Sequence, residues 1–124
     1  MNRHQRRVQS SAPPTNADLL ALRDHCREQK QIVDLALLPF DQPLAPEYVT
    51  VDGAEVARVL REARYWFGLA ADTAERAAAL SGEPRRVALN MLNKALDAAQ
   101  GFRARAARLT VVLDQFASGV AGHA

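Results

Sequence analysis

Apolar residues recur at helical spacing in three segments of the chain. In residues 16–38 the apolar positions follow steps of three, four and seven residues. They are Leu19, Leu22, Cys26, Val33 and Leu37. Thr15 or Asn16 suits an N-cap, and Asp18 suits the positive end of the helix dipole. The pattern therefore predicts a helix over residues 16–38.

The other two segments carry a longer repeat of alternating three- and four-residue steps. In residues 52–81 the repeat comprises Val56, Leu60, Ala63, Phe67, Ala70, Ala74 and Ala77. In residues 84–118 it comprises Ala88, Leu92, Leu96, Ala99, Phe102, Ala106, Leu109, Leu113 and Phe116. Gly82 suits a helix C-terminus, and Pro84 suits the first turn of the next helix. The pattern predicts two long antiparallel helices with a heptad seam that continues through Gly101.

Proline-containing segments flank the first predicted helix. Residues 1–14 lack periodicity and are predicted to form a flexible basic arm. Three prolines are predicted to break the helix after residue 38, and they are Pro39, Pro43 and Pro46. Residues 48–51 look extended, and Asp52 with Glu55 resembles a capping pair for the next helix. At the other end, residues 119–124 are predicted to be a frayed tail.

Composition agrees with a helical domain. The chain has 124 residues, of which 48% are hydrophobic and 6% aromatic. This length suits one domain, and a core rich in alanine favours closely packed helices over sheets. The expected fold is all-α, a three-helix bundle dominated by a long antiparallel helical hairpin, with residues 15–118 as a single helical domain.

The net charge of +2 hides an uneven distribution of charged residues. The N-terminal arm carries three arginines and no acidic residue, namely Arg3, Arg6 and Arg7. Residues 16–51 are acidic overall, and residues 83–124 are basic. This distribution of charge is compatible with an acidic partner. The excess of positive charge is too small to indicate nucleic-acid binding by itself.

The sequence contains little that points to catalysis. The single cysteine excludes an internal disulfide, and the three histidines are too scattered to form a ligand set. His25 and Cys26 are adjacent on a helix and therefore cannot face each other, so a core cysteine beside a surface histidine is expected. We expect no enzyme activity, no cofactor and no metal. The chain shows no signal sequence or membrane span, so a cytoplasmic location is expected.

Antiparallel packing about Gly82 would bring two groups of arginines to the same level of the hairpin. They are Arg58, Arg61, Arg64, Arg103, Arg105 and Arg108. Glu55 and Glu62 are the obvious local counter-charges, so a positive belt is predicted well away from the turn. The belt could hold phosphates or an acidic protein surface, and the alternative is an ordinary solvated helix face.

Three aromatic residues occupy consecutive positions of the second predicted helix. Tyr65, Trp66 and Phe67 fan through about 200°, so a single two-helix seam cannot bury all three rings. The remaining ring is predicted to pack on the first helix and the proline-containing loop, or on a second subunit or a target protein. Tyr65, Trp66 and the arginines of the belt are therefore the candidate partner-binding residues.

The opening Met-Asn-Arg-His-Gln-Arg-Arg resembles the start of many small bacteriophage and prophage proteins. The resemblance covers residues 1–7 and implies a phage setting, in the host cytoplasm or the virion, among virion components, assembly factors and inhibitors. We expect a non-enzymatic helical protein that binds another protein, as an assembly component or an inhibitor, and that could self-associate. The alternative is a nucleic-acid-associated accessory protein that uses the basic arm and the arginine belt. No membrane partner is expected.

Overall fold

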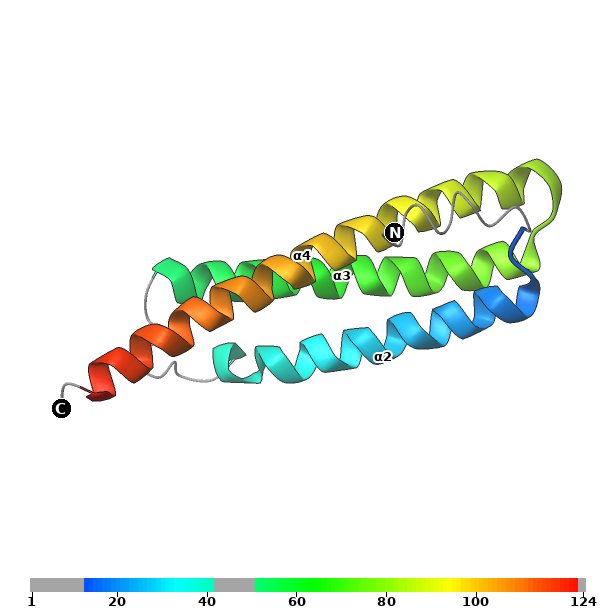
Figure 1. Ribbon diagram of the computed structural model, residues 1–124. Helices are drawn as coiled ribbons and strands as arrows, with labels where there is room; N and C mark the ends of the chain where they lie inside the picture. Colours follow the sequence, from blue (N-terminus) through cyan, green and yellow to red (C-terminus); the bar gives the residue numbers. More distant parts are fainter. Residues whose placement is uncertain (1–12, 42–50, 123–124) are drawn as a thin grey trace.

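The computed structural model describes the backbone of residues 13–41 and 51–122 and the side chains of residues 13–40 and 53–110. This part forms three helices, α2 (Asn16–Asp41), α3 (Val51–Ala79) and α4 (Gly82–Gly122), and contains no strand. The predicted all-α three-helix bundle with a long antiparallel hairpin is confirmed. Figure 1 shows α3 in the middle, with α2 and α4 lying along it. The predicted N-terminal arginines Arg3, Arg6 and Arg7 lie outside the described residues.

A reciprocal pair of hydrogen bonds begins α2. The Thr15 backbone N–H donates to Asp18 Oδ2 at 2.9 Å, and the Asp18 backbone N–H donates to Thr15 Oγ1 at 3.0 Å. These two bonds form a capping box, which satisfies N–H groups that have no partner inside the helix. The hydrogen bond from the Thr15 backbone also lowers the pKa of the Asp18 carboxyl. The predicted cap at Thr15 is confirmed.

The end predicted for α2 is wrong, because the helix continues through Pro39 and stops at Asp41. Proline has no N–H to donate to the carbonyl of Leu35, four residues earlier. The Leu35 side chain is 66% exposed, so this carbonyl lies on a face of the helix that water can reach. Phe40 continues the apolar stripe and packs against the core. Burial of the Phe40 ring favours one more helical turn in spite of the lost hydrogen bond.

The start predicted for α3 also needs correction. Val51 is helical rather than extended, and Asp52 lies inside the first turn instead of at the N-cap. Among the described side chains, the Glu55 carboxylate binds those of Arg58 and Arg105. Antiparallel packing of α4 brings Arg105 within reach of Glu55, and a pattern confined to one helix cannot reveal that contact.

The turn between α3 and α4 is built around a left-handed glycine and an arginine. Gly82 has a φ of 64°, a conformation that residues with a Cβ rarely adopt. Arg85 donates hydrogen bonds to the carbonyl oxygens of Ala77 at 3.1 Å and Leu80 at 3.3 Å. These carbonyls lie at the end of α3, where helical partners run out and a positive charge is favourable.

Arg85 also reaches the start of α2. Its guanidinium donates to Asn16 Oδ1 at 2.7 Å and to the Pro14 carbonyl at 2.9 Å. One side chain thus joins the ends of all three helices. Pro14, which the sequence assigns to the arm, is held by the bundle through this contact.

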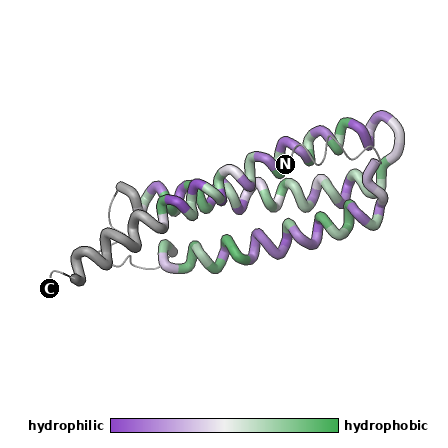
Figure 2. Tube along the Cα trace, in the orientation of Figure 1, coloured by the Kyte–Doolittle hydropathy of each residue, from purple (hydrophilic) through white to green (hydrophobic). Residues whose placement is uncertain are grey.

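The core follows the predicted apolar stripes and is wider on α3. Every predicted seam position of α3 is buried, and apolar residues recur along each helix in Figure 2. Val59 and Thr73 of α3 are also buried, as is Gln29 of α2. The Thr73 hydroxyl donates to the Leu69 carbonyl at 2.7 Å, so its polar group is satisfied within the helix. The additional burial arises because α3 packs against a helix on each of two sides.

The longest helix, α4, runs without interruption through Gly101, as the phase of its seam predicts. It begins at Gly82 and reaches Gly122, so its backbone includes residues 119–122, which the sequence assigns to the tail. No proline opposes the helix in that segment, and its small residues fit a helical backbone. The predicted seam positions Leu113 and Phe116 lie beyond the described side chains.

Candidate functional site

The three consecutive aromatic residues of α3 have different environments. The Phe67 side chain is 2% exposed and belongs to the core, and Trp66 is half-buried against the core. The Tyr65 side chain is 60% exposed. The rings of Tyr65 and Trp66 meet edge to face, with centroids 5.2 Å apart and an interplanar angle of 77°. Tyr65 is therefore the ring that the described bundle leaves on the surface.

A groove of about 390 Å³ lies beside Tyr65, between α2 and α3. We call it the Tyr65 surface, and its lining residues are Lys30, Arg61, Arg64, Tyr65, Gly68, Leu69 and Asp72. The α3 members recur at steps of three and four residues, so they share one face of the helix. Lys30 reaches across from α2 and lies beside Gly68. A Cβ built at Gly68 would lie 3.8 Å from the Lys30 side chain.

The Tyr65 surface carries more positive than negative charge. Lys30, Arg61 and Arg64 are cationic, and Asp72 is the acidic residue of the lining. Arg64 Nη1 lies 3.5 Å from Asp34 Oδ1 on α2, which offsets part of its charge. Among the described residues, Lys30 and Arg61 make no ion pair. The groove thus combines an exposed aromatic ring with two cations that are free to bind an anion.

Two other arginines of the predicted belt share one carboxylate. Arg58 donates from Nε and Nη2 to the two oxygens of Glu55 at 2.9 and 2.7 Å. Arg105 of α4 donates from Nη2 to Glu55 Oε1 at 2.8 Å. The hydrogen bond from Arg58, with a smaller contribution from Arg105, lowers the pKa of the Glu55 carboxyl. This cluster joins α3 to α4, and Glu55 neutralises part of its charge.

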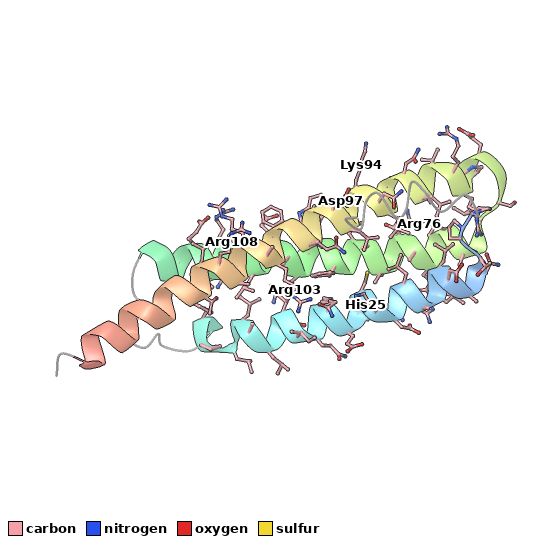
Figure 3. All side chains as sticks on the ribbon, in the orientation of Figure 1. His25, Arg76, Lys94, Asp97, Arg103 and Arg108 are labelled. Carbon is pink, nitrogen blue, oxygen red and sulfur yellow. The ribbon has the colours of Figure 1, made fainter. Side chains whose placement is uncertain are left out.

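The last two arginines of the predicted belt lie on different sides of α4. Arg103 lines a second groove, which faces α2, and Figure 3 shows Arg103 on that side and Arg108 away from it. Five positions along a helix separate side-chain directions by about 140°. The six arginines therefore lie at one end of the hairpin but do not form a single face. Of the predicted partner-binding residues, the fold gathers Arg61, Arg64 and Tyr65.

The candidate residues identified from the sequence did not include Lys30 or Arg85. Lys30 joins the Tyr65 surface from α2, and Arg85 ties the helix ends together. Both residues contact other helices, so their spacing along their own helix does not indicate these contacts. Proximity to the Gly82 turn is the one feature of the sequence that could have singled out Arg85.

Cys26 and His25, which are adjacent on α2, have different environments. Burial raises the pKa of the Cys26 thiol to about 11, which keeps it protonated at neutral pH. Cys26 is fully buried and His25 is exposed, as their adjacent positions predict. In the part of the chain that the structure describes, no three His, Cys, Asp or Glu side chains gather as metal ligands. None of the described helices is long and apolar enough to cross a bilayer.

Comparison with known proteins identifies no family for this chain. No family model matches the chain, and neither the curated proteins nor the solved structures contain a significant match. The functional argument therefore rests on the exposed ring and the charges of the Tyr65 surface.

Proposed function

We propose that this protein is a non-enzymatic helical bundle that binds an acidic segment of another protein through the Tyr65 surface. The observation that carries the proposal is a Tyr65 side chain that is 60% exposed in a groove lined by Lys30, Arg61 and Arg64. A partner bound there would place this protein as a component in the assembly of a larger particle or as an inhibitor. The resemblance of residues 1–7 to phage proteins supports a phage setting for either role.

The physical basis is the combination of an aromatic ring with neighbouring cations. Tyrosine presents a large contact area at a small cost in conformational entropy, and arginine binds carboxylates through two parallel hydrogen bonds. Both residue types are enriched among the side chains that dominate binding energy at interfaces. Tyr65 and Arg61 are one helical turn apart on α3 and can contact the same segment of a partner.

The charges around the groove favour an acidic protein segment over nucleic acid. Asp72 lines the groove, and Asp34 binds Arg64 at its edge. A phosphate backbone would bring a row of negative charges against both carboxylates, whereas a peptide can alternate acidic and apolar side chains. Nucleic-acid binding gains its affinity from many simultaneous phosphate contacts. A groove with two unpaired cations provides few of them.

The test is a capture experiment followed by affinity measurements. Immobilised full-length protein would be exposed to extracts of its source cells, and the retained protein would be purified for calorimetric titration. Tyr65→Ala and Arg61→Glu should each weaken binding by at least about tenfold, since each removes a central contact. Arg76→Glu is the matched control, because it makes the same change of charge roughly 22 Å further along α3. It should leave the affinity unchanged.

Two results would reject the proposal. Equal weakening by Arg61→Glu and Arg76→Glu would mean that overall charge, rather than the Tyr65 surface, governs binding. Retention of nucleic acid whose affinity falls steeply with added salt, and falls equally for all sequences, would favour the accessory role in nucleic-acid binding.

A further inference from the structure

A second exposed surface lies on the opposite flank of α2. Ile32 and Leu35 are 42% and 66% exposed, and with Pro39 they follow steps of three and four residues along one helix face. Figure 2 shows apolar residues gathering along the last turns of α2. Lys30 and Ile32 are two positions apart, so their side chains leave the helix about 160° apart. This apolar ridge is therefore separate from the Tyr65 surface.

An apolar groove of about 460 Å³ runs beside the ridge. Ile32 and Pro39 form its wall on α2, Arg103 lies on its wall on α4, and the buried side chains Val33, Val56 and Leu60 line it between those walls. The groove exists because α2 and α4 each pack against α3 and make little contact with each other. A ridge and a groove thus lie side by side on one face of the molecule.

The two ends of this face carry opposite charges. Glu28 lies one turn before Ile32 on the ridge, and Arg103 and Pro39 line the groove from α4 and α2. Within the described part of the chain neither residue makes an ion pair. A two-fold rotation about a point between Ile32 and Leu35 would bring the acidic end of one copy to the basic end of the other.

We propose that a second copy of this chain docks on this face and forms a two-fold symmetric dimer. The two α2 helices lie antiparallel, with Ile32 of one copy against Leu35 of the other, so that ridge packs on ridge and the two grooves face each other. The same rotation sets Glu28 opposite Pro39 of the second copy, within reach of its Arg103. The charges are therefore self-complementary, as an isologous interface requires. The inference goes beyond the binding proposed for the Tyr65 surface.

Sedimentation velocity of the full chain at concentrations up to about 1 mM tests the dimer, since even weak specific association is detectable in that range. The expected mass is twice the 13.6 kDa of the chain. Leu35→Asp should yield a monomer of unchanged helicity, because the side chain is exposed in the single chain. Glu28→Arg and Arg103→Glu should each raise the dissociation constant by at least about tenfold, and the double variant should restore dimerisation.

Lys94→Glu is the control, because Figure 3 places Lys94 on the side of α4 away from α2. This variant should dimerise like the unmodified chain. A monomer at the highest concentration, a dimer that survives Leu35→Asp, or a double variant as weak as the single ones would each overturn the proposal. Leu35→Asp should still bind the protein partner of the Tyr65 surface, so failure of one proposal is distinguishable from failure of the other.

Discussion

At the scale of single residues, Arg85 holds the ends of three helices together. Its guanidinium donates to four oxygens that belong to Pro14, Asn16, Ala77 and Leu80. The carbonyls of Ala77 and Leu80 lie near the C-terminal end of α3 and would otherwise need water. A residue that closes three helix ends together should contribute more to stability than an arginine in an exposed ion pair.

Arg85→Ala should therefore lower the free energy of unfolding by about 2 kcal/mol, the range for hydrogen bonds that involve a charged group. Urea unfolding followed by circular dichroism would measure the change. Arg86→Ala is the neighbouring control, because Arg86 pairs with Glu83 while both side chains are exposed. Equal effects of the two substitutions would contradict the role given to Arg85.

Cys26 should react slowly with thiol reagents in the folded protein. Burial raises the pKa of its thiol to about 11, from an ordinary value of 9.0, so the folded state keeps its proton where the unfolded state loses it. At about pH 9, where an ordinary thiol is half ionised, a thiol reagent should react slowly with the native chain and quickly in denaturant. Rapid stoichiometric labelling of the native chain would show that Cys26 is accessible.

The same shift has a consequence for stability. Because the folded state binds the proton more tightly than the unfolded state, Cys26 should lower the free energy of unfolding as the pH rises from about 9 towards 11. Below that window both states hold the proton and the effect vanishes.

At the scale of helices, the heptad pattern was sufficient to find the core. The predicted seam positions Val56 to Ala77 are buried because they face a neighbouring helix. The pattern could not show that α3 lies between two helices, since burial on a second side depends on the tertiary arrangement. For that reason the sequence missed Val59 and Thr73. It also ended α2 too early, because the rule for Pro39 ignores the burial of Phe40.

Two neighbouring positions on α3 provide a sharp test of the seam. Phe67→Asp should unfold the protein, because Phe67 is 2% exposed and its replacement would bury an unpaired charge. Tyr65→Asp introduces the same group two positions away on the surface and should leave the helical circular-dichroism signal and the melting temperature nearly unchanged. Similar melting curves for the two variants would contradict the assignment of Phe67 to the core.

Replacing Gly82 or Gly101 with alanine should change the free energy of unfolding in opposite directions. Gly101 lies inside α4 with open space around it, so Gly101→Ala should stabilise the protein by about 1 kcal/mol through helix propensity. Gly82 has a φ of 64°, so Gly82→Ala should destabilise it by about 1 kcal/mol. Chemical denaturation of both variants measures the two changes in the free energy of unfolding. Stabilisation by Gly82→Ala would contradict the left-handed turn.

At the scale of the whole molecule, α2 separates two surfaces. The Tyr65 surface lies on one flank of α2 and the apolar ridge on the other, so one chain could bind a partner and a second copy at once. The sequence identified Tyr65, Trp66 and the arginines as candidates from residue type and position, but it could not tell which of the two rings is exposed. It could not predict that Lys30 joins them or that Glu55 also binds Arg105, since these two contacts form between helices.

Hydroxyl-radical footprinting of the complex with the captured partner tests the central claim most directly, because it reports the exposure of individual side chains. Tyr65 and Met91 are 60% and 46% exposed in the free protein, and both side-chain types react readily. Binding at the Tyr65 surface should strongly reduce oxidation of Tyr65 and leave Met91, on α4, unchanged. Equal oxidation of Tyr65 in the free and bound protein would contradict the account.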